Sequence, residues 1–81
     1  MRPGAFLFAG KWMPSVQKLP ETGTGYTVVD VRLTDGQVFR QVVIDSGYLS
    51  RIRGRVDIPF TEDDIADIRP THEKWDWKEA P

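Results

Sequence analysis

The sequence predicts a mainly β protein, a small five-stranded antiparallel barrel with one short helical turn near residues 61–66. Two runs rich in β-branched residues flank the dipeptide Asp35-Gly36, which is the strongest short-range signal for a β-hairpin. Further short apolar runs follow, separated by turn residues. The chain has 81 residues and no cysteine, so we expect one small domain without disulfides or thiolate-held metals.

Residues 1–25 are predicted to form an N-terminal arm and linker. Proline and glycine recur throughout this segment and leave room for one short strand, Phe6 to Ala9, and no helix. We expect the arm to lie over the barrel, or to become ordered only with a partner. The barrel itself is predicted over residues 26–70.

The first barrel strand shows a clear two-residue alternation. Aliphatic residues at positions 29, 31 and 33 alternate with the polar residues Asp30, Arg32 and Thr34. This pattern is typical of a half-buried strand whose second face contacts water.

A two-residue type I′ loop at Asp35-Gly36 would set Leu33 opposite Val38 and Val29 opposite Val42. The same register sets Val31 opposite Arg40 and places a charge on the core face. We therefore predict a bend or β-bulge near Arg40-Gln41, which changes the face that points inward.

Three further strands are predicted after a turn at Asp45-Ser46-Gly47. The third strand covers residues 48–53 and ends at Gly54. The fourth covers Val56 to Phe60, at a sheet edge, because Pro59 cannot donate a ladder hydrogen bond. A short fifth strand is predicted over Ala66 to Arg69.

The helical turn between the last two strands carries its own capping signal. Thr61 is a favourable N-cap, and Asp64 is placed to accept a hydrogen bond from the Thr61 backbone. Phe60 and Ile65 occupy the two positions of a hydrophobic staple around this cap.

Residues 71–81 are predicted to form a separate tail that contains Trp75 and Trp77. Their spacing puts both indoles on one side of an extended segment. Each indole can bury about 150–250 Å². We therefore expect the tail to cover either its own barrel or another molecule.

The order of these elements resembles the Src-homology and Sm-like barrels. Two segments resemble motifs of the Sm-like family, which includes the bacterial RNA chaperone Hfq. These segments are Leu33-Thr34-Asp35-Gly36 and Ile52-Arg53-Gly54-Arg55-Val56. The resemblance implies the barrel fold, ring-like self-association and RNA binding. However, Gln41 stands where the family has a strand-bending glycine, and this chain has no asparagine for the family's base-holding loop.

Charge is distributed unevenly although the net charge is only −1. Residues 1–55 have eight basic and four acidic side chains, a balance of +4. Residues 56–81 have three basic and eight acidic side chains, a balance of −5. Such asymmetry indicates either a basic binding face or charges that cancel where the two segments mix in space.

Catalytic and metal-binding patterns are missing from the sequence. His72 is the only histidine, and no serine or cysteine lies in a nucleophile motif. Glu62, Asp63, Asp64 and Asp67 do not follow a calcium-loop spacing. We therefore expect no enzyme activity, no cofactor and no metal site.

The leading functional hypothesis is a non-enzymatic binding and assembly module that forms a homo-oligomer through strand edges. The candidate edges are Ala66–Arg69, the region of Pro59, and Phe6–Ala9. Aromatic arms would cover the seam, and the interface candidates are Phe6, Phe8, Trp12, Trp75 and Trp77.

Two alternatives remain open. The first is a single-stranded RNA- or DNA-binding protein, whose candidate contacts are Arg40, Tyr48, Arg51, Arg53 and Arg55. The second is a monomeric domain that docks a protein partner through the tryptophan tail. No apolar run reaches the roughly 18 residues that span a bilayer, so we expect a cytoplasmic protein without a membrane partner.

Overall fold

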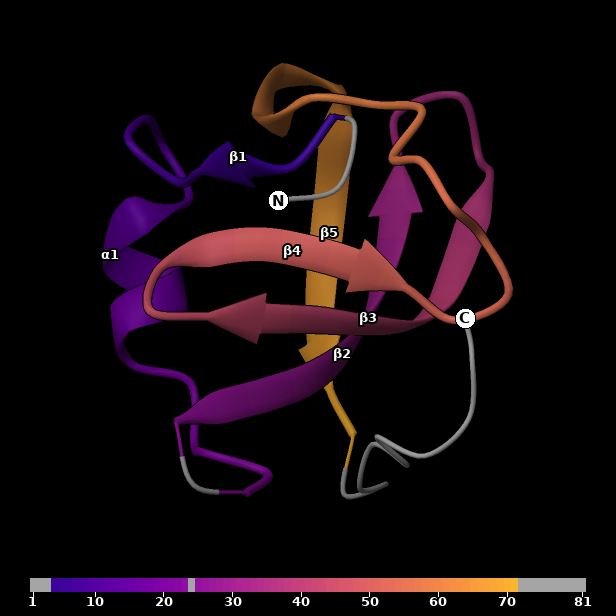
Figure 1. The fold of residues 1–81 in the computed structure, drawn as a ribbon. Helices are drawn as coiled ribbons and strands as arrows, with labels where there is room; N and C mark the ends of the chain where they lie inside the picture. Colours follow the sequence, from indigo (N-terminus) through magenta and orange to yellow (C-terminus); the bar gives the residue numbers. More distant parts are fainter. Residues whose placement is uncertain (1–3, 24, 72–81) are drawn as a thin grey trace.

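The structure, a computed structural model, describes residues 4–23 and 25–71. Its elements are β1 (Phe6–Leu7), α1 (Met13–Gln17), β2 (Tyr26–Leu33), β3 (Val38–Asp45), β4 (Tyr48–Ile52), a 3₁₀ turn (Glu62–Asp64) and β5 (Ile65–Pro70). The strands form one antiparallel sheet in the order β1-β4-β3-β2-β5. The sheet curls into a half-barrel, and β3 and β4 cross in front of β5 in Figure 1. The predicted mainly β, five-stranded class is confirmed.

The five strands are not the five that the sequence predicted. Residues 56–60, predicted as the fourth strand, form no strand, although Ile58 and Phe60 are still buried. The place beside β4 is taken by β1, in which Phe6 pairs with Leu49. Pro59 cannot donate to a ladder, and a strand from the N-terminal segment occupies the edge instead.

The N-terminal segment is part of the folded core. It contributes β1 and also α1, a short helix that the sequence analysis did not predict. Pro14 lies at the start of α1, where a missing N–H has no intrahelical partner to lose. Phe8 and Val16 of this segment are 2% and 8% exposed. The predicted arm therefore lies over the barrel and closes its core.

The turn between β2 and β3 differs from the prediction. The Leu33 N–H donates to the Gln37 carbonyl and the Gly36 N–H donates to the Leu33 carbonyl, at 2.8 and 3.0 Å. Gly36 has a positive φ of 92°, whereas Asp35 does not have a positive φ. The connection is thus a three-residue loop with a left-handed glycine, and the predicted type I′ turn is wrong here. Arg32, not Leu33, lies opposite Val38.

The predicted bulge at Arg40-Gln41 is confirmed. Val29 pairs with Val42 and Val31 pairs with Phe39, so Asp30 alone lies opposite both Arg40 and Gln41. The extra residue reverses the alternation, which points Arg40 outward and keeps the apolar residues on both sides of the bulge inward. Gln41 takes a left-handed backbone conformation, with φ of 54°.

The type I′ signature lies instead at the predicted turn between β3 and β4. Asp45 pairs with Tyr48, which leaves Ser46 and Gly47 as a two-residue loop. Their φ values are 51° and 82°, positive at both central positions.

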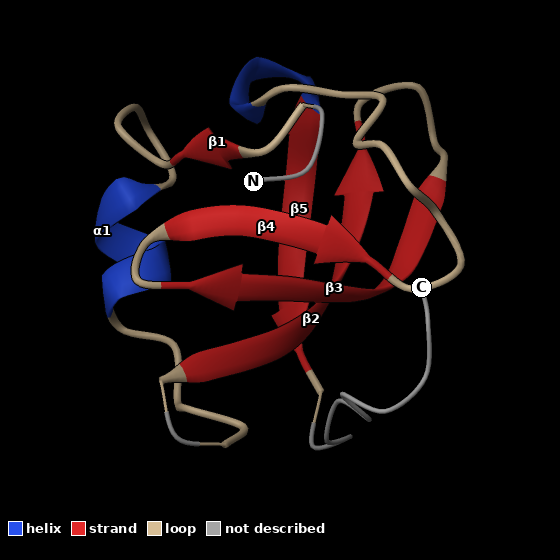
Figure 2. Cartoon of the chain, viewed as in Figure 1, coloured by secondary structure: helices blue, strands red, loops and turns tan. Residues whose placement is uncertain are grey.

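Figure 2 shows β1 and α1 beside the curled sheet. The main core joins residues of the sheet to Phe8 and Val16 of the N-terminal segment. Its residues least exposed to solvent are Val29, Val31, Val42, Leu49 and Ile65, each at 0%. Val28 and Val43 form a second, smaller cluster on the opposite face of the sheet, with Tyr26 packed against it.

The 3₁₀ turn follows the predicted capping pattern. The Thr61 N–H donates to the Asp64 carboxylate at 2.9 Å. Phe60 and Ile65, at the staple positions, are 5% and 0% exposed. The cap therefore sets the direction in which the chain enters β5.

Glu62 connects this turn to the N-terminal segment through hydrogen bonds. Its carboxylate accepts hydrogen bonds from the backbone N–H groups of Ala9, Gly10 and Trp12, at 3.0–3.1 Å. Partial burial by itself raises the pKa of Glu62, but these three donors and the nearby Lys11 outweigh it and hold the pKa below its ordinary value. This contact was not predictable from local sequence patterns, because it joins residues 50 or more positions apart.

The predicted tryptophan tail, residues 71–81, lies outside the described residues except for Thr71. The Thr71 N–H donates to the Val28 carbonyl at 3.0 Å, so the described chain ends beside β2. Among the helices in the described ranges, none has the length and apolar character needed to cross a membrane.

Candidate functional site

The outer face of β5, β2 and β3 carries a group of charged side chains around one hollow. We call this surface the arginine face. It consists of Asp30 and Arg32 from β2, Val38 and Arg40 from β3, and Asp67 and Arg69 from β5. These six residues line a hollow of about 290 Å³.

Strand pairing explains why these residues meet. Arg32 lies between Asp67 on β5 and Val38 on β3. Asp30 lies opposite Arg69 on β5, and the bulge brings Arg40 to its other side. Directly opposite residues of an antiparallel pair share one face of the sheet. The result is an alternating arrangement of positive and negative side chains.

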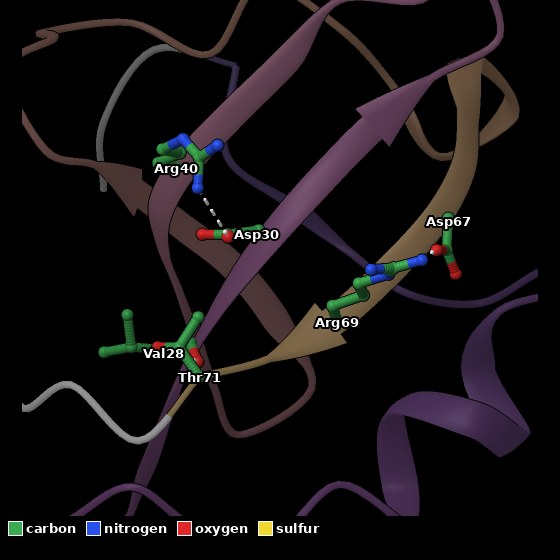
Figure 3. A network of polar contacts seen from close by, with 6 residues as sticks. All are labelled: Val28, Asp30, Arg40, Asp67, Arg69 and Thr71. Carbon is green, nitrogen blue, oxygen red and sulfur yellow. Dashed lines mark hydrogen bonds and ion pairs between the residues drawn. The ribbon is translucent and has the colours of Figure 1, made fainter.

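Two ion pairs hold this arrangement (Figure 3). Arg40 Nη1 lies 3.3 Å from Asp30 Oδ2, and Arg69 Nε lies 3.1 Å from Asp67 Oδ2. The arginine side chains are 77% and 81% exposed, whereas the two aspartates are 26% and 34% exposed. The carboxylates thus lie close to the sheet, and the guanidinium groups extend into solvent.

Exposed ion pairs of this kind contribute little to stability, at about 0–1 kcal/mol each. Their effect is mainly on position, because a paired arginine samples fewer conformations before a ligand arrives. Asp67 Oδ1 also accepts the Ile68 N–H at 3.0 Å, which fixes this carboxylate in turn.

Arg32 differs from its neighbours. It is exposed, and its side chain makes no hydrogen bond or ion pair with the other residues of 4–23 and 25–71. Asp67, which lies opposite Arg32, directs its carboxylate to Arg69 instead. The Arg32 guanidinium can therefore take a ligand without first giving up a partner.

A second hollow adjoins the arginine face at the bulge. Asp30, Arg40, Gln41 and Arg53 line this space of about 360 Å³. The Arg53 N–H donates to the Gln41 carbonyl at 3.1 Å, which ties the end of β4 to the bulge. With Arg53 included, the surface has four arginines and two aspartates, a balance of +2 in a chain whose net charge is −1.

The structure brings together two of the five predicted nucleic-acid contacts, Arg40 and Arg53. Tyr48 and Arg51 lie on β4, where Arg51 pairs opposite Val43. Arg55 lies elsewhere: it forms an ion pair with Asp57 at 3.3 Å, and its guanidinium centre is 5.8 Å from the Phe39 ring. Because β4 ends at Ile52, Arg51, Arg53 and Arg55 do not share one strand face.

Sequence reasoning missed Arg32 and Arg69 as members of this surface. Arg32 appeared as a polar position of the first barrel strand, and Arg69 only as the last residue of the predicted fifth strand. The missing information was the pairing of β2 with β5, which joins segments more than 30 residues apart in the sequence. The outward alternation around Asp30 and Arg32 was the available signal.

The interface candidates in the described residues pack against the protein itself. Phe8 is buried, and its ring centroid lies 5.2 Å from that of Phe6. The Trp12 Nε1–H donates to the Ile65 carbonyl at 3.3 Å, and the Trp12 ring packs on the core. Contact of these rings with a second chain stays a prediction, as it does for Trp75 and Trp77, which lie outside the described residues.

The candidate strand edges are partly blocked. The Thr71 backbone N–H points to β2. Because backbone groups alternate in direction along a strand, the backbone groups of Ile68 and Pro70 point away from β2, to the outer edge of β5. Pro70 has no N–H, the Ile68 N–H is taken by Asp67, and the Ile65 carbonyl is taken by Trp12. The other edge strand, β1, is only two residues long. Short and blocked edges disfavour strand addition.

Metal-binding side chains do not form a cluster in the described part of the chain. No three histidine, cysteine, aspartate or glutamate side chains there lie close enough together to hold a metal ion. The strand order and the arginine face together define the class of this protein. It is a small mainly β protein with a curled five-stranded sheet and an arginine-bearing outer face. Comparison with protein-family models, with curated proteins and with solved structures finds no match to this chain.

Proposed function

We propose that this protein is a non-enzymatic binding module whose arginine face holds an anionic chain, with single-stranded nucleic acid as the partner class. The observation that supports the proposal most is the difference in exposure between the charges. The arginines at positions 40 and 69 extend into solvent, and the aspartates that orient them lie close to the sheet. An approaching ligand therefore meets guanidinium groups first.

The geometry suits phosphate groups. A guanidinium offers planar, paired donors that match phosphate oxygens. Arg40, Arg32 and Arg69 lie on three adjacent strands, whose spacing is about 4.8 Å. The described residues of the arginine face include no aromatic ring, so contacts to the backbone of the nucleic acid carry this binding. The expected cytoplasmic location stays part of the proposal.

Replacement of Arg32 and Arg69 by alanine tests the proposal. We expect the double variant to bind a fluorescein-labelled 12-mer of uridine at least tenfold more weakly at low salt, measured by fluorescence anisotropy. The slope of log affinity against log salt should fall by about 1.4, because each phosphate contact to a single strand contributes about 0.7.

Arg55→Ala is the matched control, since Arg55 has the same charge and lies away from the arginine face. We expect this variant to bind like the wild type. An Arg55→Ala defect as large as that of the double variant would contradict the arginine face and favour the strip of residues 51–55. No binding of the 12-mer by the wild type at low salt would refute the proposed function.

Self-association is the second candidate. The observation that favours it is an apolar hollow of about 320 Å³ between β1, α1 and the turn that joins β3 to β4. Leu7 and Met13, which line it, are 49% and 39% exposed. Light scattering at high protein concentration tests it, and a strict monomer would exclude it. Docking of a protein partner through the tryptophan tail also stays a prediction.

A further inference from the structure

Two valines on the outer face of the sheet are shielded from water as completely as the core. Val28 on β2 and Val43 on β3 lie opposite each other and are 1% and 0% exposed. We call them the outer valine pair. Their chain neighbours Val29 and Val42 belong to the main core, so alternation puts the pair on the opposite face. Val38 lies on that outer face too and is 50% exposed, so a place on this face does not by itself shield a valine.

The neighbours of the outer valine pair within the sheet stand beside it. Side chains of a sheet are roughly perpendicular to it, so residues of one face flank each other. In the described ranges, the hydrophobic residue that packs against the pair is Tyr26. Tyr26 pairs with Asp45, two residues along each strand from the valines, and Arg51 lies opposite Val43 on the other side. A group that lies across the pair is still needed to close it from water.

The described chain ends next to this pair. The Thr71 N–H and the Thr71 hydroxyl both donate to the Val28 carbonyl, at 3.0 and 3.2 Å. Figure 3 shows Thr71 beside Val28 where β5 ends. The sequence continues from position 72 to position 81 and includes Trp75 and Trp77. The tail therefore starts at the edge of the outer valine pair.

The length of the tail fits this site. Val43 lies two strands away from β5, which is about 10 Å across the sheet at the usual spacing of strands. Trp75 is four residues beyond Thr71, and four extended residues span up to about 13 Å. One indole buries about 150–250 Å², enough to lie across both valines.

We propose that the outer valine pair is the docking site of this chain's own residues 72–81, with the Trp75 indole packed across both valines. The inference goes beyond the proposed function and does not rest on it. A segment tethered so close to its site has a high effective concentration there, which favours it over the tail of a second copy. The docked tail also borders Asp30 of the arginine face, two residues along β2 from Val28.

The experiment uses the full chain with ¹³C-labelled valine methyl groups, followed by NMR. We expect nuclear Overhauser contacts between the Trp75 ring protons and the methyl groups of Val28 and Val43. In Trp75→Ala these contacts should disappear and the two methyl signals should move. Its Tm should fall by at least roughly 5 °C, because apolar surface returns to water.

Asp76→Ala is the matched control in the tail. In an extended segment Asp76 points to the side opposite Trp75, so this variant should keep the wild-type Tm and methyl signals. A double-mutant cycle gives a second readout that does not depend on assignment of the ring protons. The Tm losses of Val43→Ala and Trp75→Ala should be less than additive, because the residues are in contact. Those of Val38→Ala and Trp75→Ala should add.

Three outcomes would overturn the proposal. One is a wild type without contacts between the Trp75 ring and the two valines, together with additive Tm losses for Val43→Ala and Trp75→Ala. Another is a Tm loss in Asp76→Ala as large as that in Trp75→Ala. The third is a mixed sample in which the contacts join only labelled to unlabelled molecules, since the tail of a second copy would then fill the site.

Discussion

Phe8→Ala is expected to lower the free energy of unfolding by about 3–5 kcal/mol, a large share of the stability of a domain of this size. Phe8 is 2% exposed and packs in the main core although it lies in the N-terminal segment. Removing its ring leaves a cavity between β1 and the curled sheet, which the surrounding chain fills only in part. Urea unfolding followed by circular dichroism measures the change.

Leu7→Ala is the control for this prediction, because Leu7 is the neighbouring residue of β1 and is 49% exposed. We expect it to change the free energy of unfolding by less than about 1 kcal/mol. Similar small losses in both variants would contradict the placement of the N-terminal segment in the core. The segment would then be an arm on a barrel that folds without it.

Glu62→Gln is expected to lower the free energy of unfolding by about 2 kcal/mol at neutral pH. The Glu62 carboxylate accepts the N–H groups of Ala9, Gly10 and Trp12, and hydrogen bonds to a charged acceptor are stronger than those to a neutral amide. The side chain is only half-buried, so solvent screening keeps the effect below that of a fully buried carboxylate. Amide hydrogen exchange at residues 9, 10 and 12 should speed up together.

The stability lost in Glu62→Gln should become smaller as the pH falls. Because the folded protein lowers the pKa of Glu62, its contribution is fully present above the unfolded value, near 4.5, and is lost as the pH falls through the lowered folded value. The difference in stability between wild type and Glu62→Gln should therefore be constant above about pH 5.5 and vanish in acid.

Asp63→Asn controls for the general loss of one negative charge, since Asp63 is exposed and lies next to Glu62. We expect it to leave stability nearly unchanged across the same pH range. Equal pH profiles for the two variants would show that overall charge, rather than the contact between Glu62 and the N-terminal segment, sets the acid sensitivity.

Features encoded locally were predictable from the sequence. The alternation of Val29, Val31 and Leu33 predicted the inward row of β2, and all three are buried. Arg40 on an otherwise apolar face predicted the bulge, because a charge facing the core has no favourable place. The pairing of Thr61 with Asp64 predicted the cap.

Features that depend on distant partners were not predictable. Asp35-Gly36 fits both a two-residue and a three-residue loop, and the register with Phe39 opposite Val31 selected the longer one. The spacing of Ile58 and Phe60 suited a strand, but both residues fill the core from a loop while β1 takes the edge. The choice between competing edge strands is made by packing in the whole domain.

The sequence by itself determined the mainly β class, the inward aliphatic rows and the position of the bulge, because each follows from the alternation of neighbouring side chains. Only the tertiary structure decided that the N-terminal segment closes the core and that Arg32, Arg40 and Arg69 share one surface. The physical reason is that strand order in a curled sheet depends on contacts between segments far apart in the chain. Local periodicity does not encode these contacts.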